Sequence, residues 1–344
     1  MPDKIHFAII GFGHIGQRHA QMILDHQFAV LVGTADTDAS QKKIAEENFK
    51  TLFFNSPEDL LAADLTIDVV IVATPNGLHA SNAIKALDRN CHVVIEKPMG
   101  LSKAECEEVI SKSLQVSKKV FCVMQNRYSP PSQWLKNMMT ENRLGKIFLV
   151  EVNCFWNRDD RYYHPGEKHN GRNWKGKKSL DGGPLFTQFS HFIDMMYWLF
   201  GDVTNIQTHF TNFNHQHSTE FFDDSGLVTF EFLSGGIGCF NYSTSVWDKN
   251  MESSITIIGA KGSIKVGGQY MERIEYCHIE NYTMPELPAS NPPNDYGGYK
   301  GSAANHQYVI QNVIDTLTGK STISTNALEG MKVVEIIERF YKMK

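Results

Sequence analysis

The sequence predicts an α/β domain built on a doubly wound parallel sheet, followed by an α+β domain with a large, open, mostly antiparallel sheet. Strand-like and helix-like runs alternate over residues 1–123, and a glycine-rich turn follows the first strand. Beyond residue 200, short strand-like runs are joined by turns, which is typical of hairpins. Because 344 residues exceed one ordinary core, we place the two domains at residues 1–123 and 124–344.

Elements of the first domain follow from runs rich in Val, Ile and Phe that are separated by helical stretches. The predicted strands are 5–10, 28–35, 68–73, 92–96 and 120–124. The predicted helices are 16–26, 39–48, 57–62, 79–88 and 102–118. In open sheets of this kind, ligands bind beyond the carboxyl ends of the strands.

The turn after the first strand has the spacing G-x-G-x-x-G at Gly11, Gly13 and Gly16. This pattern, leading into a helix, predicts a turn that holds a dinucleotide pyrophosphate at the helix N-terminus. The predicted cofactor-binding residues of this turn are Gly11, Phe12, Gly13, His14, Ile15 and Gly16. Asp36 ends the next strand, twenty residues past Gly16, where its carboxylate can accept from a ribose hydroxyl. No Arg follows closely and the carboxylate would repel a 2′-phosphate, so we expect NAD rather than NADP.

Two further strand exits carry polar residues at the same edge of the sheet. The first exit supplies Thr74, Pro75, Asn76 and His79, which we expect beside the cofactor. The second supplies Glu96 and Lys97, an acid and an amine whose backbone is restricted by Pro98.

The second domain begins near residues 124–131, where the alternation stops. The predicted helices are 130–141, 185–200, 302–318 and 326–343. The predicted strands are 147–156, 205–213, 226–233, 237–245, 253–259, 263–266 and 273–276. The segments 157–178 and 281–299 are predicted loops. The first of these is long, basic and aromatic, so we expect it to cover a polar ligand. Its notable residues are Tyr162, Tyr163, His164, Arg172, Trp174 and Lys175.

The predicted helix 185–200 carries one polar stripe, because Thr187, His191 and Asp194 recur at i, i+4 and i+7. A hydride can leave a carbinol carbon only when a base removes the hydroxyl proton, and histidine suits this task near neutral pH. Lys97, at the end of a nucleotide-binding strand, could share that proton or stabilise an alkoxide. On the residues alone, His191 is equally well explained as a hydrogen-bonded core histidine.

Several motifs together resemble one family, that of glucose–fructose oxidoreductase, inositol dehydrogenase and the rhizopine catabolism proteins (Gfo/Idh/MocA). They are Gly11–Gly16, Glu96-Lys97-Pro98, Gln125-Asn126-Arg127-Tyr128, Gly182-Gly183-Pro184-Leu185 with His191-Phe192-Ile193-Asp194, and Gly259-Ala260-Lys261-Gly262-Ser263.

The resemblance implies oxidation or reduction of a sugar, cyclitol or nucleotide-sugar hydroxyl. It implies that Lys97 and His191 are the catalytic pair and that Glu96 holds the nicotinamide ribose. It also implies a homodimer or homotetramer joined through the open face of the C-terminal sheet. Gln125 is then a further cofactor contact. The predicted substrate contacts are Lys97, Asn126, Arg127, Trp174, Thr187, Gln188 and His191, with Asn126 and Arg127 facing an interdomain cleft.

Thr187 departs from inositol-type members, which carry Asp four residues before the histidine. A threonine hydroxyl can only hydrogen-bond, so Thr187 is counted with the catalytic residues while the inositol reading weakens. Members with a neutral residue there include nucleotide-sugar 3-dehydrogenases. The segment 172–178, with Lys300 and His306, could receive a diphosphate and a sugar, although a solvated charge run explains it as well.

Composition excludes other classes. A net charge of −5 argues against nucleic acid or an anionic membrane as the main partner, and no apolar run reaches 18 residues. The N-terminus lacks the features of a signal peptide and the six cysteines form no C-x-x-C pair, so we expect a cytoplasmic protein. His215-x-His217 lacks a third ligand, and no metal site is expected.

Other functions stay open from the sequence. The alternatives are an inositol or other polyol dehydrogenase, a glycosidase that uses NAD transiently, and an NAD-binding sensor without catalysis. A glycosidase would hydrolyse its substrate without accumulating NADH, and a sensor would keep its role when Lys97 and His191 are replaced.

Overall fold

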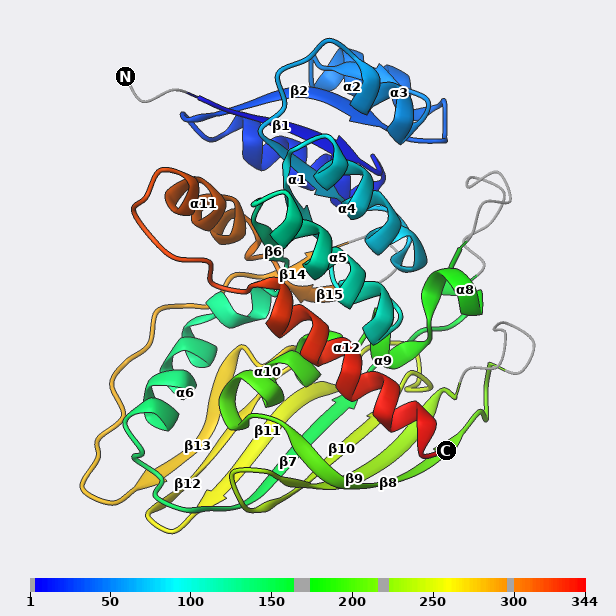
Figure 1. The fold of residues 1–344 in the computed structure, drawn as a ribbon. Helices are drawn as coiled ribbons and strands as arrows, with labels where there is room; N and C mark the ends of the chain where they lie inside the picture. The colour runs from blue at the N-terminus through cyan, green and yellow to red at the C-terminus, as the bar shows by residue number, and fades with distance from the viewer. Residues whose placement is uncertain (1–3, 164–173, 216–222, 296–299) are drawn as a thin grey trace. The chain divides into compact units, whose positions relative to one another are not determined.

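The computed structural model describes residues 4–163, 174–215, 223–295 and 300–344, and it divides the chain into two compact units (Figure 1). Unit 1 contains residues 1–124 and 306–334, and unit 2 contains residues 125–305 and 335–344. The chain therefore returns to unit 1 near its C-terminal end. A division at one point of the sequence does not describe this return.

Unit 1 is built on a six-stranded sheet in the order β3-β2-β1-β4-β5-β6, in which every pairing is parallel. The predicted doubly wound parallel sheet is confirmed. Its strands are β1 (Ile5–Ile10), β2 (Ala29–Ala35), β3 (Leu52–Phe54), β4 (Val69–Val72), β5 (His92–Ile95) and β6 (Val120–Cys122). Strand β3 was missed by the sequence analysis, because it has three residues at the sheet edge and its Leu52 is exposed.

The helices of unit 1 connect these strands, and α11 packs beside α1. They are α1 (His14–Leu24), α2 (Gln41–Asn48), α3 (Pro57–Ala62), η1 (Asn76–Leu78), α4 (His79–Asp88), α5 (Lys103–Gln115), α11 (His306–Leu317) and the first part of α12 (Ala327–Lys342). All residues of β4 are buried, as expected for a strand covered on both faces. Because the strands are parallel, the exits after β1, β4 and β5 share one edge of the sheet.

Unit 2 contains a seven-stranded sheet in the order β13-β12-β11-β7-β10-β9-β8, antiparallel throughout except for the β7–β10 pair. This confirms the predicted mostly antiparallel sheet. Its strands are β7 (Ile147–Phe155), β8 (Val203–Thr211), β9 (Ser225–Phe232), β10 (Ile237–Ser243), β11 (Glu252–Gly259), β12 (Gly262–Gly267) and β13 (Arg273–Ile279). A two-stranded sheet joins β14 (Pro293–Asp295) to β15 (Lys300–Ala303).

One face of the large sheet is covered by α6 (Pro130–Thr140), α10 (Ser190–Phe200) and the end of α12 (Figure 1). The smaller helical segments of unit 2 are η2 (Gln125–Tyr128), α7 (Asp160–Tyr163), α8 (Lys178–Asp181) and α9 (Pro184–Thr187). Aromatic side chains fill the layer between sheet and helices. Trp156 meets Phe189 and Phe192 edge-on at 5.5 and 5.7 Å, and Phe340 stacks on Phe230. This packing fixes α10, and with it His191, on the sheet.

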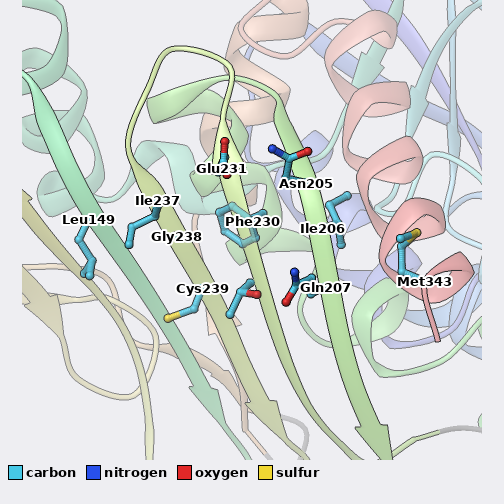
Figure 2. A pocket seen from close by; sticks show the side chains of 11 residues that line it. Leu149, Asn205, Ile206, Gln207, Phe230, Glu231, Ile237, Gly238, Cys239 and Met343 are labelled. Atoms are coloured by element: carbon cyan, nitrogen blue, oxygen red, sulfur yellow. The ribbon is translucent and has the colours of Figure 1, made fainter.

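The other face of the sheet is exposed, as the alternating burial along β9 shows. It contains a shallow hollow of about 750 Å³ over β7, β8, β9 and β10 (Figure 2). Leu149, Ile237 and Cys239 line it beside the polar Gln207 and Glu231. Leu227 and Ile237, both more than half exposed, add apolar surface to this face.

Several predicted elements differ from the structure, among them the predicted loop 281–299, which contains β14. The predicted helix 185–200 is wrong, because α9 ends at Thr187 and α10 begins at Ser190. The predicted loop 157–178 contains α7, and the last helix pair begins at His306 rather than residue 302, because Lys300–Ala303 pairs as β15. Among the described residues, no helix is both long and apolar enough to cross a membrane.

Candidate active site

The glycine turn of unit 1 is tightly packed at Gly11 and Gly16 and open at Gly13. Gly11 has a φ of +93°, and a Cβ there would lie 2.5 Å from the Ala73 carbonyl oxygen. A Cβ at Gly16 would collide with the Gly11 carbonyl oxygen, whereas one at Gly13 would meet nothing within 4 Å. Helix α1 begins at His14 with no side-chain cap and no acidic residue in its first turn. Its first N–H groups and the open side at Gly13 therefore suit a pyrophosphate.

Asp36 lies against this turn. Its Oδ2 accepts the Phe12 N–H at 2.6 Å, and its Oδ1 accepts the Asp38 N–H at 2.8 Å. These bonds orient the carboxylate while lone pairs remain for the hydroxyls of a ribose. The sequence prediction for Asp36 thus has a structural basis at the end of β2.

His79 braces two strand exits. Its Nδ1 lies 2.6 Å from the Pro98 carbonyl oxygen and its Nε2 lies 2.7 Å from that of Thr74, and the side chain is buried. Asn76, which begins η1, is buried as well. The loops after β4 and β5 are therefore tied together by His79, so the ring itself serves the shape of the pocket. Burial lowers the pKa of His79, and the hydrogen bonds to the Pro98 and Thr74 carbonyl oxygens oppose this decrease.

Glu96 follows β5 and lies beside two histidines. Its Oε1 lies 2.8 Å from His19 Nε2 and 3.5 Å from His306 Nε2. Burial alone would raise the pKa of Glu96, but the His19 hydrogen bond and the charges of His306 and Lys97 hold it at about 2. The carboxylate is therefore ionised at neutral pH. Lys97 follows directly and is partly exposed, and the Lys97–Pro98 peptide bond is cis.

The buried His306 makes the stability of unit 1 depend on pH. Burial lowers its pKa from 6.5 to about 3 despite the attraction of Glu96, with His19, Arg18 and Lys97 adding to the decrease. Below pH 6.5 His306 is protonated in the unfolded chain but stays neutral in the folded chain. The free energy of unfolding therefore decreases as the pH falls towards 3. The slope is about 1.4 kcal/mol per pH unit for this group.

We expect His306→Gln to reduce the loss of unfolding free energy between pH 6.5 and 5 by roughly 2 kcal/mol, measured by urea denaturation. Parallel pH profiles for the two proteins would contradict a neutral buried His306.

In unit 2, His191 on α10 lies beside the segment η2. The side chain is 3% exposed, and its Nε2 lies 3.3 Å from Gln125 Nε2. Asn126 Oδ1 accepts from Ser302 Oγ at 2.5 Å. Among the described residues, Gln125 Oε1 and Asn126 Nδ2 are buried polar atoms without a hydrogen-bond partner. Such atoms beside a histidine mark a place for a polar ligand.

Arg127, a predicted substrate contact, forms a buried ion pair within unit 2. Its Nε and Nη2 donate to the Asp194 carboxylate at 2.9 and 2.6 Å, and both residues are almost fully buried. The guanidinium also lies 5.2 Å from the centre of the Trp198 ring. Because α10 carries both Asp194 and His191, this ion pair positions the helix. The sequence analysis had placed Asp194 in the stripe but had not paired it.

Thr187 is held by a carboxylate that the sequence analysis missed. Since α9 and α10 are separate, Thr187 and His191 do not share one helical stripe. The Thr187 hydroxyl donates to Asp181 Oδ1 at 2.5 Å, and the N–H groups of Gly176 and Gly183 donate to the same carboxylate. Burial raises the pKa of Asp181, and these three donors oppose the rise. Asp181 is not among the predicted site residues, because no helical periodicity links it to Thr187.

Gln188 is also engaged within unit 2. Its Oε1 accepts from Arg158 Nε at 2.7 Å, and its Nε2 donates to the Tyr162 hydroxyl at 2.6 Å. Arg158 is fully buried over the Trp156 ring, and Lys175 Nζ lies 4.0 Å from the centre of the Tyr162 ring. Burial and the charge of Arg158 lower the pKa of Lys175 to about 8. The sequence analysis overlooked Arg158, which organises this cluster.

Other predicted contacts separate in the structure. Trp174 is partly exposed, and its carbonyl oxygen accepts from the Lys177 N–H. His164, Arg172 and His217 lie outside the described residues. The expectation that Lys300 and His306 receive a diphosphate is corrected for His306, whose side chain is buried in unit 1 beside Glu96. His215 bonds Asp224 and the Arg158 carbonyl oxygen. Within the described part of the chain, no three His, Cys, Asp or Glu side chains are grouped to hold a metal ion.

Two models of known protein families match this chain. Residues 5–124 match the family model described as "Oxidoreductase family, NAD-binding Rossmann fold", and residues 136–343 match its "C-terminal alpha/beta domain". The chain belongs to the Gfo/Idh/MocA family. The resemblance predicted from the sequence motifs is confirmed.

Several relatives of this chain are named for sugars or sugar derivatives or are crystallised with them. The WlbA dehydrogenase of Chromobacterium violaceum, crystallised with NADH and UDP-GlcNAcA, is 31% identical, with a TM-score of 0.87, and the match covers 100% of this chain and 94% of that one. Glucose-6-phosphate 3-dehydrogenase of Bacillus subtilis is 24% identical over 97% of this chain and 95% of its own. The 2,7-anhydro-N-acetylneuraminate hydratase of Escherichia coli is 28% identical, and the match covers 77% of this chain and 68% of that protein.

This Gfo/Idh/MocA member is therefore an NAD-dependent oxidoreductase acting on sugar hydroxyls. The structure fits the cofactor, because the turn is open at Gly13 and Asp36 is oriented beside it. Bound NAD supplies the acceptor or donor of a hydride. The α1 N-terminus and Gly13 would hold its pyrophosphate, and Asp36 would hold a ribose.

Gly13→Ala tests this fit. Because the new Cβ meets no protein atom within 4 Å, we expect the free energy of unfolding to fall by about 1 kcal/mol or less. The methyl group would occupy space for the pyrophosphate, so NAD affinity should fall at least about tenfold. Gly16→Ala is the matched comparison, since its Cβ collides with the Gly11 carbonyl oxygen and should damage stability and binding together. Calorimetric NAD titration and thermal unfolding of both variants measure this, and full NAD affinity in Gly13→Ala would contradict the placement.

Proposed function

We propose that this chain transfers a hydride between NAD and a ring hydroxyl of a nucleotide-linked sugar, such as a UDP-N-acetylhexosamine or its uronate. The observation that carries the proposal is the match along the whole chain, at 31% identity, to a dehydrogenase crystallised with NADH and UDP-GlcNAcA. Thr187 agrees with it, because the position that is Asp in inositol-type members is neutral here.

In this proposal His191 is the base that removes the proton of the reacting hydroxyl. Its imidazole can accept a proton near neutral pH, and the buried amides of Gln125 and Asn126 offer polar atoms to the sugar. Lys97 shares the proton or stabilises the alkoxide as it develops. Glu96, ionised at neutral pH, accepts from the nicotinamide ribose.

The Thr187 hydroxyl serves as an acceptor. Its proton is directed to Asp181 Oδ1, so toward a substrate donor the hydroxyl oxygen would act as the acceptor. Lys175, whose pKa of about 8 keeps it largely protonated at pH 7, supports an anionic substrate group near the same cluster. These roles extend the function from the hydride transfer to the recognition of a charged sugar.

A substrate panel tests the proposal. Purified protein with NAD is offered UDP-GlcNAc, UDP-GlcNAcA, glucose 6-phosphate, free hexoses and myo-inositol, and NADH formation is followed by absorbance. We expect kcat/KM for a UDP-sugar to exceed that for any free sugar at least about tenfold, since the diphosphate adds charge-assisted bonds. A preference for myo-inositol would support a polyol dehydrogenase instead.

Two further outcomes separate the remaining functions. Conversion of a glycoside without accumulated NADH, but with solvent deuterium incorporated into the product, would indicate transient oxidation. A relative of this chain is named as a hydratase and not as a dehydrogenase, which is the reason to measure this outcome. NAD binding without turnover of any substrate would favour a sensor.

We further propose that the exposed face of the large sheet joins copies of this chain into a homodimer or homotetramer. The face carries exposed Leu227 on β9, and exposed Ile237 lines the hollow of Figure 2. Ile237→Lys places a charge there and should shift the protein to a smaller species in light scattering after gel filtration, while unfolding temperature of the fold itself changes little. An unchanged molar mass, with the wild type already monomeric, would contradict the assembly.

A further inference from the structure

Two histidines from distant parts of the chain converge on one oxygen of Glu96. His19 comes from α1, the helix that follows the glycine turn, and His306 is the first residue of α11. Their Nε2 atoms lie 2.8 and 3.5 Å from Glu96 Oε1, and the two rings meet edge-on with centroids 5.5 Å apart. All three side chains are buried, Glu96 being 6% and His306 1% exposed.

The tautomers follow from these contacts. A carboxylate can only accept, so each Nε2 facing it must carry hydrogen. Burial keeps His306 neutral, so its Nδ1 is a bare acceptor, and among the described residues Nδ1 of both histidines has no hydrogen-bond partner. A bare imidazole acceptor costs little when buried compared with an unpaired N–H or charge. His19 Nε2 therefore donates to Glu96 Oε1, and His306 Nε2 faces the same oxygen at the longer distance of 3.5 Å.

The second carboxylate oxygen is left for a ligand. Within the described part of the chain, Glu96 Oε2 receives only the long 3.3 Å contact from the Lys97 N–H. His19 donates to Oε1 at 2.8 Å, and His306 Nε2 faces the same oxygen at 3.5 Å, so both rings lie on the Oε1 side of the carboxylate and Oε2 is on the other side. We propose that His19 and His306 are positioning residues that clamp Glu96 through Oε1 and so present Oε2 as the acceptor for the nicotinamide ribose hydroxyls. This inference rests on the proposed role of Glu96 in cofactor binding.

The clamp also gives the late segment of the chain a role in the cofactor site. Residues 306–334 return to unit 1, and α11 packs beside α1. His306 is the first residue of this returning segment, which is separate in sequence from the glycine turn and from the strand exits after β4 and β5. A packing role alone would need an apolar side chain of similar size at position 306, not a donor aimed at a carboxylate.

The test is a double-mutant cycle on NAD affinity. His306→Leu removes the donor, His306→Gln keeps a donor of similar reach, and Glu96→Gln removes the charge on which the clamp acts. Dissociation constants for NAD and for ADP, which lacks the nicotinamide ribose, are measured by calorimetric titration, and unfolding temperature is recorded for every variant. We expect His306→Leu to weaken NAD binding roughly tenfold with ADP binding unchanged, and His306→Gln to recover most of the loss. In the Glu96→Gln background, His306→Leu should have no further effect on NAD.

Each other outcome overturns the clamp. Equal losses in His306→Leu and His306→Gln, or losses that add fully to that of Glu96→Gln, would make the role structural. Weaker ADP binding in step with NAD would show that the whole turn has been disturbed. If Glu96→Gln itself leaves NAD affinity unchanged, the proposed ribose contact fails, and this is distinguishable because ADP and NAD then bind to every variant as to the wild type.

Discussion

Replacing His191 with asparagine is expected to lower kcat by about three orders of magnitude while NAD affinity stays near that of the wild type. The asparagine amide can keep a hydrogen bond with Gln125 but cannot take a proton from a hydroxyl. His191 belongs to unit 2 and the glycine turn to unit 1, so the substitution leaves the pyrophosphate-binding residues intact. Steady-state kinetics with the best substrate of the panel, together with NAD titration, measure the two quantities.

His209→Asn is the matched control for this substitution. His209 is exposed on β8, so the same chemical change there should alter neither kcat nor stability. If His191→Asn turns over within tenfold of the wild type, His191 is not the base and Lys97 becomes the residue to test. A large loss of unfolding temperature in His191→Asn would instead assign the histidine to the core.

Replacing Arg127 with methionine is expected to cost about 3–5 kcal/mol of unfolding free energy, because Asp194 would be left buried without its bidentate partner. The ion pair joins η2 to α10, the helix that carries His191. Activity should therefore fall even at temperatures where the variant is folded. Urea denaturation and kinetics at low temperature check the two effects separately.

A double variant, Arg127→Met with Asp194→Leu, separates charge from packing. Removing both charges leaves no unpaired ion in the core, so most of the lost stability should return. If the double variant is as unstable as Arg127→Met alone, the cost lies in packing against Trp198 rather than in the buried carboxylate.

The cofactor half was predictable because its signals are local. Gly11 and Gly16 each meet a backbone requirement within one turn, Gly13 leaves the turn open, and Asp36 follows at a spacing set by one strand and one helix. The substrate half was less predictable. The stripe from Thr187 to Asp194 assumed an unbroken helix, yet the chain breaks at Gln188, whose amide is held by Arg158 and Tyr162. Helical periodicity concerns residues a few positions apart, so it could not predict the hydrogen bonds of Gln188 with Arg158 and Tyr162.

The sequence by itself determined the fold class, the glycine turn with its acid, and the identity of Lys97 and His191 as candidates, because hydrophobic periodicity and turn chemistry act over a few residues. Only the tertiary structure decided which side chains hold others. It paired Arg127 with Asp194, set Asp181 behind Thr187, and brought His306 from the far end of the chain to Glu96. These contacts depend on how separate elements pack, and burial then sets which groups stay charged, neither of which is written in the local order of residues.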